Sequence, residues 1–83
     1  MADEQQKIVV ELLERRKEQD AQWGGAEHDD THSASDWRDY IEKQLNDADN
    51  AIAFAAWRDR MVDVGALAMA AIEWADRKTE SSI

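Results

Sequence analysis

The sequence predicts an all-α fold, a three-helix bundle with a long C-terminal helix, and three observations support this prediction. Proline is absent from the 83 residues, so no helix is interrupted by a residue that lacks a backbone N–H. Apolar residues recur at the three- and four-residue spacing of an amphipathic helix in three separate segments. The adjacent Gly24 and Gly25 mark the clearest break in the chain. We therefore expect residues 1–83 to form a single helical domain.

The first predicted helix covers residues 3–21, and its apolar stripe consists of Ile8, Val9, Leu12 and Leu13. A loop over residues 22–34 follows and reads QWGGAEHDDTHSA. It is rich in Gly, Asp, Ser and Thr, as turns are, yet it also carries one Trp and two His. Turn chemistry does not explain these aromatic residues, so we treat the loop as the candidate functional segment.

The second predicted helix covers residues 36–46, with Ser35 as its N-cap. Its apolar face is formed by Trp37, Tyr40, Ile41 and Leu45. The third predicted helix covers residues 51–78 and is apolar nearly all round between Met61 and Ile72, which is typical of a helix buried on several sides. The two shorter helices supply too few large apolar residues to cover both of its faces. We therefore expect a homo-oligomer, with a tight three-helix monomer as the alternative.

The charge of the chain limits the classes of partner. Nineteen acidic and 10 basic residues give a net charge of −9, which repels phosphate backbones, so we expect no direct binding to nucleic acid. This charge is compatible with binding to divalent cations, to basic protein surfaces, or to a small anion in a local basic pocket. Alternatively, the charge serves only to keep the protein soluble. The absence of cysteine excludes disulfide bonds and thiolate metal sites.

The sequence also predicts where the protein resides. The first residues, MADEQQK, contain no apolar stretch of the kind that a signal peptide requires. The most apolar segment is shorter than the ~20 residues of a membrane span. We therefore expect a cytoplasmic protein with no membrane partner, located in the host cytoplasm if a phage encodes it.

The segment from Trp23 to His32 carries the first group of candidate site residues, namely Trp23, His28, Asp29, Asp30 and His32. Carboxylate and imidazole groups are the usual oxygen and nitrogen ligands of Mg, Mn or Zn ions, and they also contact ligands directly. The alternative is an Asx-type turn that tethers the loop to the next helix. Trp23 can likewise serve as a stacking platform for a base or as a plug at the end of a small core.

Two acidic motifs form a second group of candidates. Glu11 and Glu14 read E-x-x-E, and Glu73 and Asp76 read E-x-x-D, so each pair shares one face of a predicted helix. Four carboxylates from two facing helices can hold Mg or Mn ions that clamp a triphosphate. Beside them lie four basic residues that can contact phosphate, Arg15, Arg16, Arg77 and Lys78. The alternative is a set of exposed, salt-bridged charges.

Several short motifs occur in a distinctive order. They are E-R-R at residues 14–16, W-G-G at 23–25, E-H-D-D-x-H at 27–32, D-W at 36–37 and A-L-A-M-A-A-I-E-W-A-D-R-K at 66–78. The chain thereby resembles small phage and prophage proteins described as MazG-like, over roughly residues 9–78. The resemblance implies an all-helical dimer or tetramer that hydrolyses nucleoside triphosphates to monophosphate and pyrophosphate. It also implies Mg ions on the E-x-x-E and E-x-x-D motifs, although the family places these two motifs closer together in sequence.

Three functions follow as hypotheses. The first is a nucleotide-binding protein, with Mg-dependent pyrophosphohydrolase activity as its active version. The second is an acidic anti-defence protein of a phage, which sequesters a nucleotide signal or imitates nucleic acid to inhibit a host defence protein or CRISPR complex. The third is a structural helical module that interacts with other proteins and binds no ligand.

Overall fold

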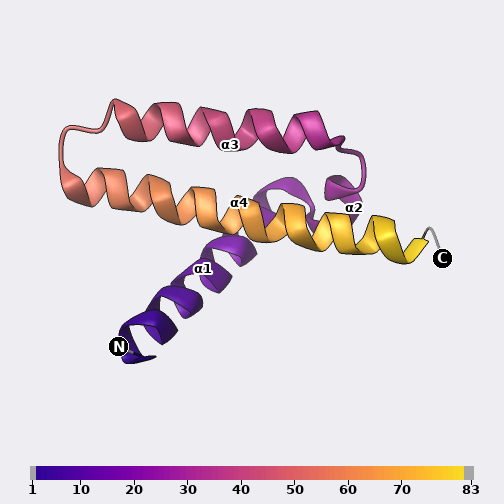
Figure 1. The fold of residues 1–83 in the computed structure, drawn as a ribbon, viewed down its shortest axis with the longest axis horizontal. Helices are drawn as coiled ribbons and strands as arrows, with labels where there is room; N and C mark the ends of the chain where they lie inside the picture. Colours follow the sequence, from indigo (N-terminus) through magenta and orange to yellow (C-terminus); the bar gives the residue numbers. More distant parts are fainter. Residues whose placement is uncertain (1, 82–83) are drawn as a thin grey trace.

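A computed structural model describes residues 2–81 and confirms the all-α prediction (Figure 1). The described residues form four helices rather than the expected three. These are α1 (Ala2–Trp23), α2 (Gly25–Asp29), α3 (Ala34–Asp49) and α4 (Phe54–Ser81). The long C-terminal helix is present as predicted, and the additional helix α2 lies inside the segment expected to be a loop.

Helices α3 and α4 form an antiparallel hairpin that contains the small core (Figure 1). Trp37 from α3 packs against Leu67 and Ala70 from α4, and all three side chains are buried. Ile41, Ala71 and Trp74 are packed around this cluster and are partly buried. The core therefore lies along one side of α4, which leaves another side free for α1.

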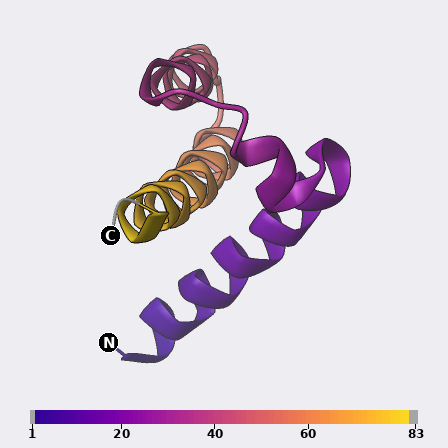
Figure 2. The ribbon, with the colours of Figure 1, turned by 90° about the vertical axis from the view of Figure 1, so that its right-hand side faces the viewer.

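Helix α1 crosses α4 at a steep angle and packs against the middle of that helix (Figure 2). The crossing is close because α4 has no side chain at Gly65, where Leu12 of α1 lies against the backbone. Ion pairs flank it, since Arg15 donates hydrogen bonds to Asp63 and Asp59, each over 2.7 Å. These two hydrogen bonds raise the pKa of the Arg15 guanidinium, which stays charged and holds α1 against α4.

The glycine pair separates α1 from α2 as expected, but by a tight turn rather than a long loop. Gly24 and Gly25 have φ angles of +99° and +66°, which L-residues with side chains rarely adopt. The Gly24 N–H donates a 2.8 Å hydrogen bond to the carbonyl oxygen of Asp20 and thereby closes the last turn of α1. Only residues 30–33 remain as an irregular connection between α2 and α3.

The predicted boundaries of the later helices need correction. Helix α3 begins two residues before the expected position because Ser33, not Ser35, is its N-cap. The Ser33 hydroxyl accepts a hydrogen bond from the Asp36 N–H, and the Asp36 carboxylate accepts one from the Ser33 N–H. This capping box satisfies two backbone donors at once, which a cap at Ser35 does not do. Helix α4 begins at Phe54 rather than residue 51.

The arrangement leaves α1 and α3 apart on α4. No Cα atom of α1 lies within 8 Å of one of α3 in the described residues, although both helices pack on α4. Helix α2 contacts α1 and α4 beside this gap (Figure 2). No helix within residues 2–81 combines the length and apolar character needed to cross a membrane.

Candidate functional site

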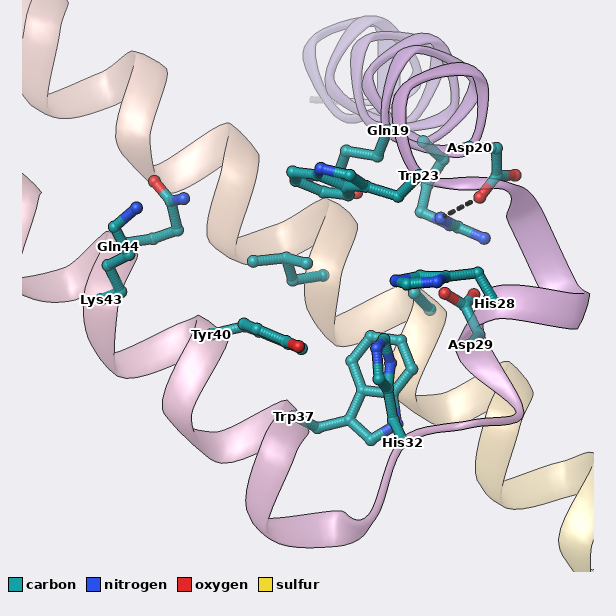
Figure 3. Close-up of a pocket in the computed structure, with 13 residues that line it drawn as sticks. Gln19, Asp20, Trp23, His28, Asp29, His32, Trp37, Tyr40, Lys43 and Gln44 are labelled. Carbon is teal, nitrogen blue, oxygen red and sulfur yellow. Dashed lines mark hydrogen bonds and ion pairs between the residues drawn. The ribbon is translucent and has the colours of Figure 1, made fainter.

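The separation of α1 from α3 produces a cavity of about 300 Å³ that is open to solvent (Figure 3). Helix α4 forms its base with Leu67 and Ala70, while α1 and α3 form opposite walls and α2 closes one end. Protein interiors seldom contain voids much larger than a water molecule. A cavity of this size in an 83-residue chain is therefore the first candidate for a ligand site.

Aromatic rings from all three surrounding elements line the cavity. Trp23 of α1 and Tyr40 of α3 lie on opposite sides of it (Figure 3). The His32 ring packs against the α3 wall, because its centroid lies 5.0 Å from that of Trp37 and 5.1 Å from that of Tyr40. His28 continues this series at 4.8 Å from His32, in an edge-to-face arrangement. Such a lining favours a flat, apolar-faced ligand group.

Two polar side chains of α1 are buried at the cavity although they carry hydrogen-bonding groups. Arg16 is 8% exposed and Gln19 is 7% exposed, and both lie one turn apart on the face that lines the cavity. The Arg16 guanidinium donates hydrogen bonds to Asp20 over 2.9 Å and to Glu73 over 3.1 Å. Its Nε and the Gln19 Oε1 are buried without a partner among the described residues, which is uncommon for buried polar atoms and distinguishes this wall of the cavity.

Asp29 of α2 supplies a buried carboxyl group to the same cavity. It is 8% exposed and accepts no hydrogen bond from the described residues. Burial raises the pKa of this carboxyl, and the positive charge of Arg16 partly opposes the shift. A buried carboxylate without donors is unfavourable for folding, and residues of this kind are concentrated at functional sites.

The structure brings together four of the six ligand-contact candidates. Trp23, His28, Asp29 and His32 line the cavity. Asp30 points elsewhere and forms a 3.0 Å ion pair with Arg77. Arg15 lies outside the cavity and binds Asp59 and Asp63 of α4. The distinctive segment from Trp23 to His32 therefore contributes mainly to one site.

The structure does not bring the four predicted metal ligands together within one chain. Glu11 binds the Arg58 guanidinium through both carboxylate oxygens, at 2.6 and 2.9 Å, whereas Glu73 binds Arg16 on the cavity side of α1. Glu14 and Asp76 are exposed. Within the part of the chain that is described, no three His, Cys, Asp or Glu side chains converge as metal ligands would. These residues do not fit the two-motif arrangement in a single chain, so the Mg or Mn site stays a prediction.

Several site residues carry no signal in the sequence that marks them as ligand contacts. Gln19 reads as a surface position of a charged helix, and Lys43 and Gln44 read as the polar face of the next one. Arg16 is expected to contact phosphate beside the acidic motifs, not to line this cavity. Tyr40 reads as a core position, although 42% of its surface is exposed. Their positions depend on how α1 and α3 are placed on α4, which helical periodicity does not specify.

Comparison with protein-family models, with curated proteins and with solved structures gives no significant match to this chain.

Proposed function

We propose that the cavity binds a nucleotide, with the base among the aromatic rings. The observation that carries this proposal is the combination of aromatic walls with buried polar atoms that have no partner. The volume of about 300 Å³ is at the lower end of the range for small-molecule pockets. A planar base stacks on rings such as those of Trp23 and Tyr40. Its ring nitrogens and exocyclic groups supply the hydrogen bonds that the buried atoms lack.

The charge of the site indicates how many phosphates the ligand carries. Lys43 lies at the open side of the cavity and is exposed, so its ammonium group is available to a phosphate. The Arg16 charge is already compensated by Asp20 and Glu73. A net charge of −9 on the chain repels a highly charged ligand. We therefore expect a nucleoside monophosphate to bind at least as tightly as the triphosphate.

Removal of one aromatic wall tests this proposal. Nucleotide binding is measured by isothermal titration calorimetry, with quenching of tryptophan fluorescence as a second readout. Stacking on an aromatic side chain contributes about 1–3 kcal/mol per base, so Tyr40→Ala should weaken binding roughly tenfold. Leu45→Ala is the matched control, because Leu45 lies on the same helix, is similarly exposed at 41% and does not line the cavity. Equal affinities of the two variants, or no binding to the wild type, would contradict the proposal.

The proposal concerns binding and contains no hydrolytic step. Glu11 and Glu73, one from each acidic motif, are engaged by arginines in different parts of the structure. Release of pyrophosphate from each nucleoside triphosphate, with Mg or Mn and a Glu14→Ala control, measures hydrolysis independently of affinity. Activity that depends on Glu14 would add a catalytic function to the binding site.

We also propose that the chain pairs with a second copy. Ile8, Val9, Val10 and Leu13 of α1 are 45–54% exposed. The accessible surface is 6098 Å², whereas a folded monomer of 9.5 kDa exposes about 5,000 Å². The excess resembles the ~800 Å² that each partner buries in an ordinary protein–protein interface.

A further inference from the structure

Two polar residues of the cavity, Arg16 and Asp29, lack hydrogen-bond partners at part of their side chains. The inference rests on the nucleotide site proposed above. Nε of Arg16 is a buried donor without a partner, and the carboxylate of Asp29, which lines the same cavity, accepts no hydrogen bond from the described residues. Both residues are only 8% exposed.

Arg16 is held in place by its own ion pairs. Its Nη1 donates to Asp20 on the same helix, and its Nη2 donates to Glu73 on α4. These contacts fix the plane of the guanidinium and leave Nε as the buried donor without a partner. A ligand therefore meets a directional N–H donor here, while most of the positive charge is compensated.

Asp29 lies close to Arg16 but does not bind it. The Arg16 charge acts on the Asp29 carboxyl strongly enough to oppose the rise that burial causes in its pKa, yet the two form no ion pair. Figure 3 shows the carboxylate beside the His28 ring, directed toward the cavity. Space for a ligand group therefore remains at these oxygens, which are able to accept two parallel N–H donors.

We propose that Arg16 and Asp29 recognise the guanine base. Guanine presents an acceptor, O6, followed by two donors, N1–H and the 2-amino group, along one edge. One N–H donor followed by a carboxylate complements this order. Adenine presents a donor and an acceptor, hypoxanthine lacks the 2-amino donor, and xanthine carries an acceptor in its place. With each of these bases, a polar atom of the site either has no partner or faces a group of the same hydrogen-bonding kind. Such a mismatch strongly reduces affinity in sites built from hydrogen-bonding groups.

A series of four nucleoside monophosphates tests the proposal on the full chain by calorimetry. GMP should bind about tenfold or more tighter than IMP, XMP and AMP, because each of these loses a hydrogen bond to a buried charged group. In Asp29→Asn, the side chain presents one acceptor and one donor, which complements N1–H and O2 of xanthine. This variant should bind GMP at least tenfold more weakly and should prefer XMP.

Asp30→Asn is the matched control, because Asp30 is the next residue, is exposed and binds Arg77 instead of lining the cavity. It should keep the preference for GMP. Equal binding of the four nucleotides by the wild type, or an equal loss for all four in Asp29→Asn, overturns the recognition of guanine and leaves the nucleotide site in place. Absence of binding by any of them overturns both proposals.

Discussion

Among single residues, Asp29 lines the cavity although its buried carboxyl destabilises the fold. Its carboxyl is buried and has no hydrogen-bond donor among the described residues. Arg16 attracts it from nearby, while the carboxylate of Asp20 acts in the opposite direction. A residue that only stabilised the fold would be better placed with a partner or in solvent. The position of Asp29 is explained if a ligand supplies the donors.

Replacement of Asp29 by Asn should stabilise the protein at neutral pH. Burial raises the pKa of Asp29, so the folded state binds the proton more tightly than the unfolded state. The charged form therefore costs stability above the raised pKa, and this cost decreases as the pH falls toward the ordinary value of 3.8. We expect Asp29→Asn to increase the free energy of unfolding in urea at pH 7 by about 1 kcal/mol, with a smaller gain near pH 4. A loss of stability at pH 7 would show that attraction to Arg16 outweighs desolvation.

Arg15 and Arg16 are neighbours on α1, yet their side chains face different parts of the structure. Successive residues of a helix are about 100° apart around its axis. Arg15 therefore faces Asp59 and Asp63 of α4, while Arg16 faces the cavity. The sequence predicts a phosphate contact for either arginine, and only Arg16 lines the cavity. The two have the same chemistry, so only the rotation of α1 about its axis distinguishes them.

At the scale of helices, the crossing of α1 and α4 depends on close approach at Gly65. A Cβ atom at this position would lie 2.7 Å from Cδ2 of Leu12, which is shorter than an ordinary contact. Glycine within a helix is destabilising by roughly 0.5–1 kcal/mol relative to alanine. The retention of glycine here is explained by the packing of Leu12, which fixes the width of the cavity by holding α1 on α4.

A double-mutant cycle separates these two effects. Gly65→Ala alone should change stability little or reduce it, because strain against Leu12 opposes the gain in helix propensity. In a Leu12→Ala background the strain is absent, so the same substitution should stabilise the protein by about 0.5–1 kcal/mol. Urea denaturation of the four proteins, followed by circular dichroism, gives the coupling between the positions. A full gain from Gly65→Ala in both backgrounds would contradict close packing at this crossing.

At the scale of the whole molecule, the described chain has more exposed apolar surface than its core explains. Helices α3 and α4 use their facing sides to bury Trp37, Leu67 and Ala70. Half-exposed apolar residues therefore remain on α1, and both Ile52, between α3 and α4, and Phe54, the first residue of α4, are more than nine-tenths exposed. A domain of this size is marginal when it exposes such surface, which favours association with another chain.

Pairing of two copies through α1 is tested by the mass of the protein in solution. We expect light scattering after size-exclusion chromatography to give twice the 9.5 kDa of the chain. Val9→Glu would bury a carboxylate without a partner in the apolar interface, which is unfavourable. This variant should therefore have the mass of the monomer. Ile72→Glu is the control, since Ile72 is an apolar residue of α4 that is 61% exposed and does not belong to α1. A monomeric wild type at micromolar concentration would rule out this pairing.

Four features follow from the amino-acid pattern alone, namely the helical class, the long last helix, the break at the glycine pair and the distinctive segment from Trp23 to His32. These features depend on local spacing, on the absence of proline and on backbone conformations that only glycine adopts readily. The short helix α2 and the cap at Ser33 were not predicted, because each depends on one or two hydrogen bonds among several compatible turn arrangements.

The identity of the polar residues that form the cavity depends on how the helices pack against one another. Arg16, Gln19 and Tyr40 come from different helices, and they meet because α1 and α3 both pack on α4 without touching each other. Helical periodicity specifies which residues share a face, but it contains no information on the angle and rotation at which two helices cross. The sequence therefore identified the segment that closes the site, whereas the crossing of α1 and α4 determined the walls that a ligand would contact.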